Sequence, residues 1–270
     1  MLEREVLNKE AGQRDMPLGK MRGVLREYLQ TLILRELYKI PEGKKMYFTG
    51  GTYLRLVHRI KRFSEDLDFN TDEINQETFE NLMKQVQRNI KNEGLAAKIE
   101  FRHWDNILAG DLIFPDIEKH YGISSPHQRK EGVVIKFETN RPKWKIKTES
   151  LMVSGFGNMF PVVCTDKGAL FADKIDALIK KDRARHLFDI MFMLSHNYPI
   201  DLNVLNVLGI TGSAQELILA RVKSLSEKQL EQFAEQLRPF LFEESETDLV
   251  VHAHSVIPQL IRNYQGKLKE

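Results

Sequence analysis

Cysteine is almost absent from this sequence of 270 residues, which contains a single one at position 164. One thiol excludes an internal disulfide and a zinc site built from several thiolates of the same chain, and it agrees with a reducing compartment. The residues before Cys164 are Pro-Val-Val. This setting favours a small buried apolar side chain over a reactive thiol.

The sequence also lacks long apolar runs and an excess of one charge. No segment approaches the roughly 18 apolar residues of a membrane span, and the N-terminal Met-Leu-Glu-Arg-Glu-Val has neither the basic start nor the apolar core of a signal peptide. The net charge of +2 is too small for an overall field that captures nucleic acid, although local patches can still do so. We therefore expect a cytoplasmic protein without a membrane partner.

What is present is typical of a globular protein, with 42% hydrophobic and 29% charged residues. The length suffices for two modest domains. Strand-like and helical segments alternate up to about Pro161, and helical segments alone follow. We predict an α+β protein: a lobe with a small mixed sheet and an N-terminal helical segment over 1–160, then an α-helical lobe over 161–270.

Apolar spacing, glycines and prolines place the individual elements. A core-facing helix is expected at 21–40, and a strand at 45–49 runs into a glycine turn and a helix at 52–60. The region 105–131 indicates only a short strand near Leu112 and an irregular connection. The remaining predicted strands are 97–103 and 132–140, and the remaining predicted helices are 75–92, 165–180, 184–196, 201–208, 213–224, 227–240 and 245–266.

The most informative stretch is 50–69, where a glycine turn and a helix precede two carboxylates, Asp66 and Asp68. On a strand, residues two apart share a face, so both carboxylates would point one way while Leu67 and Phe69 enter the core. Mg²⁺ prefers oxygen ligands and is usually bound by one or two carboxylates together with substrate phosphates. A nucleoside triphosphate is therefore the expected further ligand.

The glycine turn supplies the phosphate-binding half of this prediction. Gly50 and Gly51 have no Cβ, so their backbone NH groups can approach a phosphate closely. Thr52 would be an N-cap residue or present its hydroxyl to the phosphate. Ser64 is a further candidate nucleotide contact, or a turn or capping residue.

A third carboxylate is predicted on the strand at 132–140. Lys136 and Glu138 share one face of that strand, and Glu138 would complete three anions around two Mg²⁺ ions. Lys136 is then a candidate nucleotide contact. The alternative is that Lys136 and Glu138 simply pair with each other on a solvated face.

A second cluster lies in the helices predicted at 165–180 and 184–196. Lys174 is one helical turn from Leu170 and Leu178. Its aliphatic chain could therefore pack along the core-facing side of the helix, or its charged amine could contact a triphosphate. Asp189 follows Arg185 by four residues, a spacing that permits a weak surface ion pair.

Together these residues resemble the signature of the AbiEii/AbiGii-type toxin nucleotidyltransferases, of the polymerase-beta-like nucleotidyltransferase superfamily. The resemblance spans about residues 45–195, and nothing after residue 195 contributes to it. The segments that carry it are Gly50-Gly51-Thr52, Ser64-Glu65-Asp66-Leu67-Asp68-Phe69, Lys136-Phe137-Glu138, and the helical run from Asp173 to Asp189.

The resemblance implies a protein that binds a nucleoside triphosphate with Mg²⁺ between a mixed-sheet lobe and a helical lobe. Relatives are toxins of abortive-infection (phage-defence) or toxin–antitoxin pairs, and some transfer nucleotides to the acceptor end of tRNA. A cognate antitoxin is therefore a possible partner. The implied roles are metal ligation by Asp66, Asp68 and Glu138, phosphate contact by Gly51 and Thr52, triphosphate contact by Lys174, and orientation of Lys174 or another basic residue by Asp189.

Two basic runs suggest RNA as the acceptor, because both flank the predicted site and Trp144 could stack a base. Solvated surface is the alternative for each run. The sequence thus predicts Mg²⁺-dependent transfer of a nucleoside monophosphate to RNA, and it leaves open a protein hydroxyl as acceptor or a non-catalytic nucleotide-binding regulatory module. The runs are Arg55, His58, Arg59, Lys61 and Arg62, and Arg141, Lys143, Trp144, Lys145 and Lys147.

Overall fold

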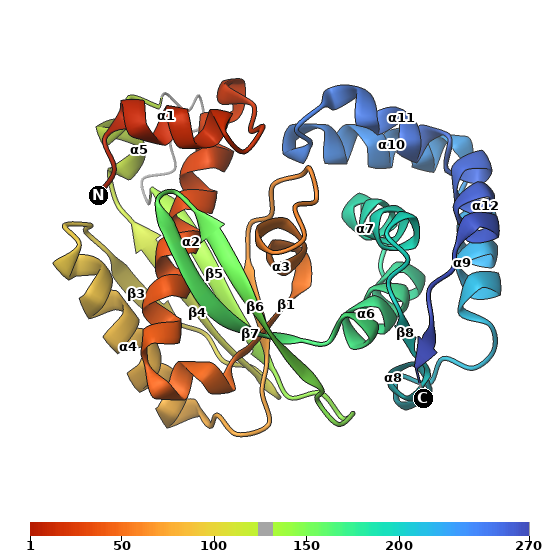
Figure 1. The fold of residues 1–270 in the computed structure, drawn as a ribbon, viewed down its shortest axis with the longest axis horizontal. Helices are drawn as coiled ribbons and strands as arrows, with labels where there is room; N and C mark the ends of the chain where they lie inside the picture. The colour runs from red at the N-terminus through yellow and green to blue at the C-terminus, as the bar shows by residue number, and fades with distance from the viewer. Residues whose placement is uncertain (124–131, 270) are drawn as a thin grey trace. The chain divides into compact units, whose positions relative to one another are not determined.

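The computed structural model describes residues 1–123 and 132–269 (Figure 1). The chain forms two compact units. The first comprises Met1–Pro142 and Thr148–Thr165, and the second comprises Lys143–Lys147 and Asp166–Glu270. The boundary predicted at residue 160 falls inside a strand of the first unit, β7 (Asn158–Thr165).

A mixed sheet of seven strands in the order β3-β4-β5-β2-β1-β7-β6 forms the centre of the first unit. Strand β2 pairs antiparallel with β1 and parallel with β5, and β1 pairs parallel with β7. The predicted α+β class with a mixed sheet is confirmed. The other strands are β1 (Tyr47–Thr49), β2 (Leu67–Asn70), β3 (Lys98–Phe101), β4 (Ile107–Phe114), β5 (Val133–Asn140) and β6 (Thr148–Gly155).

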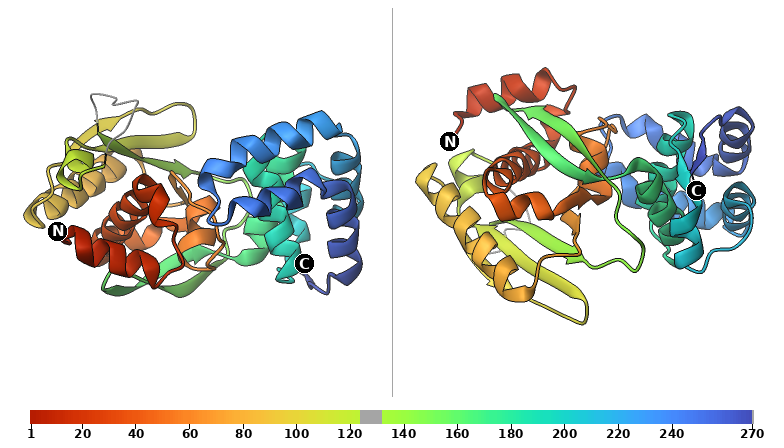
Figure 2. Two further views of the ribbon diagram at one scale, coloured as in Figure 1. Left: turned by 90° about the horizontal axis from the view of Figure 1, so that it is seen from above. Right: turned by 60° about the horizontal axis from the view of Figure 1, so that its bottom comes forward.

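Two long helices, α2 (Met21–Lys39) and α4 (Gln76–Asn92), lie side by side over the sheet (Figure 2). Both agree with the predicted helices at 21–40 and 75–92. The apolar face of the sheet is built by register: Leu67 of β2 lies opposite Phe137 of β5, and both are fully buried. The rings of Phe69 and Phe137 stack 6.2 Å apart. Alternation along β2 and β5 leaves Asp68, Lys136 and Glu138 on the opposite face.

Helix α3 (Gly50–Leu56) directly follows β1 and is shorter than the predicted helix at 52–60. Two further short helices, α1 (Arg4–Gly12) and α5 (Ile117–His120), complete the first unit. Cys164 is buried as predicted, and burial raises the pKa of its thiol. No helix of the described residues is long and apolar enough to cross a membrane.

The strands of this unit differ from the prediction in two places. Strand β4 is eight residues long, where only a short strand near Leu112 was expected. The hairpin β6–β7 was missed, because Gly155, Gly157 and Pro161 suggested a loose connection. Phe156 and Gly157 instead form its turn with positive φ angles of 51° and 71°, which is ordinary hairpin geometry. Part of the connection predicted at 105–131, residues 124–131, lies outside the described residues.

The second unit is helical, and its predicted helices are confirmed with one exception. The helix expected at 245–266 is two helices that meet at His252, whose φ and ψ of −95° and 24° interrupt the helical backbone. No glycine or proline marks that break. A short parallel pair, β8 (Ile200–Asp201) and β9 (Leu268–Lys269), is also present. The helices are α6 (Lys167–Lys180), α7 (Ala184–Ser195), α8 (Leu202–Val207), α9 (Ala214–Lys223), α10 (Glu227–Leu237), α11 (Thr247–Val251) and α12 (Ala253–Asn263).

Candidate active site

Two carboxylates stand on the polar face of the sheet, at the start of β2. Asp66 directly precedes the strand and Asp68 lies within it, and both are partly exposed. Leu67 and Phe69 are fully buried on the other face. The alternation expected from the sequence is therefore confirmed, and it directs both carboxylates to the same side of the sheet.

Glu138 joins this face from the neighbouring strand. Asp68 and Glu138 are register partners in the parallel pair β2–β5, so their side chains leave the sheet on one side at adjacent positions. Glu138 also forms an ion pair with Lys136 of its own strand. The pairing considered as an alternative for these two residues is thus present, and any cation that binds Glu138 competes with the lysine.

The glycine turn is packed directly against Asp68. Gly50 has a φ of +78°, a conformation that L side chains rarely adopt, and an added Cβ would come within 2.8 Å of the Asp68 Cβ. At Gly51 an added Cβ would lie 2.8 Å from both Arg62 Nη2 and Ser64 Oγ. The two glycines therefore let the turn approach the segment that carries the carboxylates.

Thr52 acts on Asp66 through the backbone. Its side chain is fully buried, and its hydroxyl donates a hydrogen bond to the backbone carbonyl of Asp66. The N-cap prediction for Thr52 is wrong, since helix α3 begins after Thr49. Thr52 thus positions the start of the carboxylate strand from the helix that follows the glycine turn.

Helix α2 supports the same segment with a polar side chain that the sequence analysis did not single out. The Gln30 side-chain amide donates to the backbone carbonyls of Ser64 and Glu65, at 3.1 and 2.9 Å. Gln30 is 1% exposed, so these bonds satisfy a buried polar group. The sequence did offer a signal for this role, because Gln30 is a polar residue inside a helix that was predicted to face the core.

A second support from α2 holds helix α3. Glu27 Oε2 lies 2.8 Å from Arg55 Nε, and Glu27 Oε1 lies 3.1 Å from Arg14 Nη2. Glu27 and Arg55 are each only 2% exposed, and so is Arg62. Arg55 and Arg62 were expected in a surface run for RNA, and this prediction was wrong because both side chains are buried in the first unit.

In the second unit, Lys174 and Asp189 form a buried ion pair. Lys174 Nζ lies 2.8 Å from Asp189 Oδ2, and the side chains are 8% and 0% exposed. His186 lies nearby on α7, and both of its ring nitrogens are buried without a hydrogen-bond partner among the residues that the structure describes. Burial, with a further contribution from the positive charge of Lys174, lowers the pKa of His186 to about 3. The imidazole is therefore neutral near pH 7.

The donor set of the first unit is suited to Mg²⁺ in its chemistry. Asp66, Asp68 and Glu138 offer hard carboxylate oxygens, and Mg²⁺ commonly takes one or two of these with phosphate oxygens and water. Within residues 1–123 and 132–269, no three or more His, Cys, Asp or Glu side chains are gathered as a metal cluster. The substrate phosphates would therefore have to supply part of the coordination, as is usual for this ion.

Comparisons with known proteins agree with this architecture. The chain resembles the solved structure of JHP933 from Helicobacter pylori, with 17% identity, coverage of 90% of this chain and 94% of that chain, and a TM-score of 0.53. It also resembles MenT4, a nucleotidyltransferase toxin from Mycobacterium tuberculosis H37Rv, with 14% identity, coverage of 98% and 92%, and a TM-score of 0.58. At these identities the likeness establishes the fold.

Sequence comparison supplies the family. No curated protein matches the chain. The model of the AbiEii family, described as the nucleotidyl transferase AbiEii toxin of type IV toxin–antitoxin systems, matches residues 32–254. This match includes the glycine turn, all three carboxylates and the Lys174–Asp189 pair, and it confirms the resemblance. The chain is thus a nucleotidyltransferase that belongs to the AbiEii toxin family of type IV toxin–antitoxin systems.

Proposed function

We propose that the protein transfers a nucleoside monophosphate from a nucleoside triphosphate to a hydroxyl of RNA, at the 3′ end of tRNA, in a Mg²⁺-dependent reaction. The observation that carries this proposal is the adjacency of Asp68 and Glu138 on one sheet face, with the Gly50 turn packed against Asp68. Carboxylates beside a backbone turn can hold a phosphate-bound cation.

In this proposal Asp66, Asp68 and Glu138 bind the cation, and the backbone of Gly50 and Gly51 approaches the phosphates. Mg²⁺ supplies charge neutralisation and orients the oxygens of an in-line displacement. The acceptor hydroxyl loses its proton to solvent as its oxygen bonds to the α-phosphorus. The bond between the α-phosphorus and the oxygen that bridges to the β-phosphate breaks, and pyrophosphate leaves with that oxygen.

The other candidate residues have supporting or nucleotide-binding roles. Thr52 and Gln30 hold the chain around Asp66 through hydrogen bonds to backbone carbonyls. Ser64 and the Lys174–Asp189 pair are candidates for contact with the nucleotide. Lys174→Met is expected to raise the KM for the nucleotide, because it removes a positive charge that a triphosphate can bind.

In the cell we propose that this reaction inactivates RNA until a cognate antitoxin, the partner that the family implies, opposes it. The biological setting that follows is phage defence by abortive infection. Growth arrest on expression, relieved in Asp68→Asn, would agree with a toxin whose effect depends on transfer. Arrest of equal strength with Asp68→Asn would show that toxicity does not need the carboxylate site.

The test is incubation of the full chain with each of the four α-labelled nucleoside triphosphates, Mg²⁺ and total RNA. Parallel reactions also contain total cell protein as a candidate acceptor. Label that migrates with RNA supports the proposal, and label that migrates with protein would identify a protein hydroxyl as the acceptor. Product that persists in Asp66→Ala and Asp68→Ala contradicts the assigned site. If wild type transfers no label and Asp68→Ala still binds the nucleotide, the protein would instead be a regulatory binding module.

A further inference from the structure

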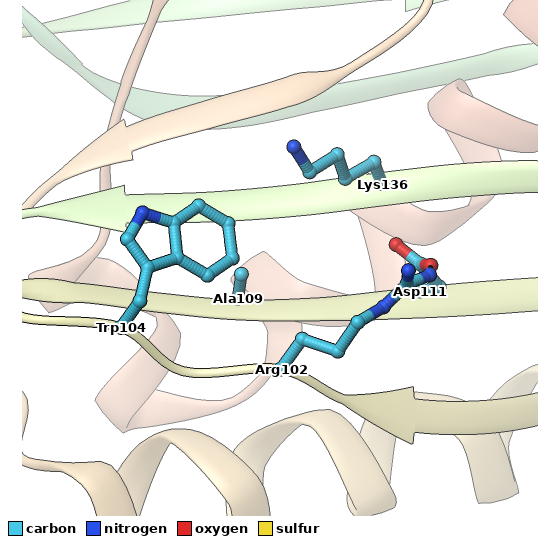
Figure 3. A pocket seen from close by; sticks show the side chains of 5 residues that line it. All are labelled: Arg102, Trp104, Ala109, Asp111 and Lys136. Carbon is cyan, nitrogen blue, oxygen red and sulfur yellow. Dashed lines mark ion pairs between the residues drawn. The ribbon is translucent and has the colours of Figure 1, made fainter.

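Next to Glu138 the polar face of the sheet is hollowed into a pocket of about 250 Å³. Its floor is Ala109, a buried residue of β4 that is the register partner of Glu138. Neighbouring strands are about 4.8 Å apart, so the pocket begins roughly 5 Å beyond the Glu138 backbone. The lining residues, all in the first unit, are Arg102, Trp104, Ala109, Asp111 and Lys136 (Figure 3).

The side chain of Trp104 forms one side of the pocket, and hydrogen bonds fix the backbone of this residue. Its NH donates to the Ile107 carbonyl at 3.1 Å, and the Ile107 NH donates back at 2.8 Å, so Trp104 closes a tight hairpin between β3 and β4. Asp105, at the tip of that hairpin, has a φ of 49°. The tryptophan remains 40% exposed. A large part of the indole surface is therefore accessible to solvent, on the same sheet face as Asp68 and Glu138.

Two cations line the same pocket as this indole. Lys136 Nζ lies 5.4 Å from the centroid of the Trp104 ring, within the range of a cation–π contact. Arg102, with a side chain that is 65% exposed, is anchored by an ion pair with the buried Asp111. An exposed aromatic ring beside basic side chains is suited to stacking a base of a single strand while the cations attract the backbone.

The order of the strands places this pocket and the glycine turn on opposite sides of the two carboxylates Asp68 and Glu138. One row of register partners runs from Thr49 in β1 through Asp68 and Glu138 to Ala109 in β4. The glycine turn follows Thr49 at one end of the row, and the pocket occupies the other end. In an in-line displacement the attacking and leaving oxygens lie on opposite sides of the phosphorus. With the triphosphate at the glycine turn, the acceptor arrives from the pocket side.

We propose that this pocket binds an unpaired nucleobase at the acceptor end of the RNA, stacked on Trp104, with the adjoining phosphate near Arg102 and Lys136. The inference rests on the proposed function for the direction of transfer, and it adds the residues that receive the acceptor. A base within a duplex is already stacked on its neighbours, so the pocket selects single-stranded ends.

Binding of a short fluorescein-labelled single-stranded RNA, measured by anisotropy without nucleotide or Mg²⁺, tests this directly. Trp104→Ala is expected to weaken binding at least about fivefold, and Trp104→Phe to retain most of it, because a phenyl ring still stacks. Met159→Ala is the control, since Met159 is a 74% exposed apolar residue of the same unit outside the pocket. Equal affinities of Trp104→Ala and Met159→Ala would overturn the proposal.

Tryptophan fluorescence supplies a second readout that does not depend on Trp104→Ala folding well. The chain has two tryptophans, so Trp144→Phe leaves Trp104 as the sole indole. Single-stranded RNA is expected to quench this variant more strongly than a blunt duplex of the same sequence. Quenching of Trp104 by a nucleoside triphosphate alone, and not by RNA, would assign the pocket to the incoming base and overturn the acceptor assignment.

The binding assay separates this inference from the proposed function. Loss of RNA binding in Trp104→Ala supports the pocket even if wild type transfers no label, an outcome that would contradict the transfer proposal alone. Label transfer to RNA with an unchanged acceptor KM in Trp104→Ala would contradict the pocket alone.

Discussion

The Asp68 carboxylate occupies the space that a side chain at Gly50 would fill. An added Cβ at position 50 would lie within 2.9 Å of the Asp68 carboxyl carbon, and the φ of +78° at Gly50 disfavours any L side chain there. The turn that would hold phosphate and the carboxylate that would hold the cation are therefore packed as one structure. Disturbing either is expected to disturb the other.

Gly50→Ala should reduce nucleotidyl transfer at least about tenfold, because Asp68 must move away from the turn and misplacement of about 1 Å is costly to catalysis. Gly94→Ala is a matched control: its φ is +82°, and an added Cβ meets nothing within 4 Å. Both variants should lose roughly 1–2 kcal/mol of stability from backbone strain. Labelled transfer and thermal unfolding measure the two effects, and equal activity of the two variants would contradict the packing argument.

Thr52→Val and Thr52→Ser separate the shape of Thr52 from its hydroxyl. Valine removes the donor and leaves the Asp66 carbonyl without its buried partner, which costs about 1–3 kcal/mol. Serine keeps the donor. We expect Thr52→Val to lower both stability and transfer, and Thr52→Ser to retain most of each. Similar losses in the two variants would mean that packing of the methyl group, rather than the hydrogen bond, matters.

Glu27→Ala should destabilise the first unit by about 3–5 kcal/mol, because it removes a buried carboxylate that pairs with the buried Arg55 guanidinium. Lys39→Ala, on the same helix, removes a side chain that is 56% exposed and paired with Glu36. That variant should change stability by less than about 1 kcal/mol. Urea unfolding followed by circular dichroism provides the comparison, and a Glu27→Ala effect no larger than that of Lys39→Ala would refute the anchoring role.

The second unit should lose stability in mild acid through His186. Its folded pKa, about 3, is below the value of about 6.5 expected when unfolded, so the unfolded chain binds more protons between these values. The stability is therefore complete above about pH 6.5 and falls as the pH is lowered, by roughly 3 kcal/mol at pH 4.

His186→Leu should flatten this part of the pH profile, whereas His252→Leu, which removes an exposed histidine, should not. Unfolding free energies measured from pH 7 to pH 4 test the difference. Identical slopes in wild type and His186→Leu would show that the burial of His186 does not govern acid sensitivity.

The sequence predicted the local pattern at the site well, because strand alternation is a short-range property. It placed Asp66 and Asp68 opposite Leu67 and Phe69, and the structure confirms this. It also predicted that Glu138 joins Asp66 and Asp68, but not the register that makes Asp68 and Glu138 neighbours, which depends on how strands 70 residues apart meet in the sheet. Nor could it separate the buried Arg55 and Arg62 from surface cations, since charge alone does not reveal a buried partner.

The pocket beside Glu138 escaped the sequence analysis for a similar reason. Trp104 lies in the hairpin turn that joins β3 to β4, whereas Lys136 lies in β5. The segment 105–131, which follows Trp104, was interpreted as a short strand and an irregular connection. The hairpin β6–β7 was missed because its turn residues also suit a linker. Local signals thus predicted the elements, while contacts across the sheet determined the site.

The central claim is that Asp66, Asp68 and Glu138 form one cation site for nucleotidyl transfer. Its most direct test is the yield of labelled RNA as a function of Mg²⁺ concentration in Asp66→Asn, Asp68→Asn and Glu138→Gln. Glu100→Gln is the control, because Glu100 is an exposed carboxylate on β3. We predict a loss of about a hundredfold or more in each of the three variants and none in the control. Wild-type yield in Asp68→Asn or Glu138→Gln at equal Mg²⁺ would contradict the account.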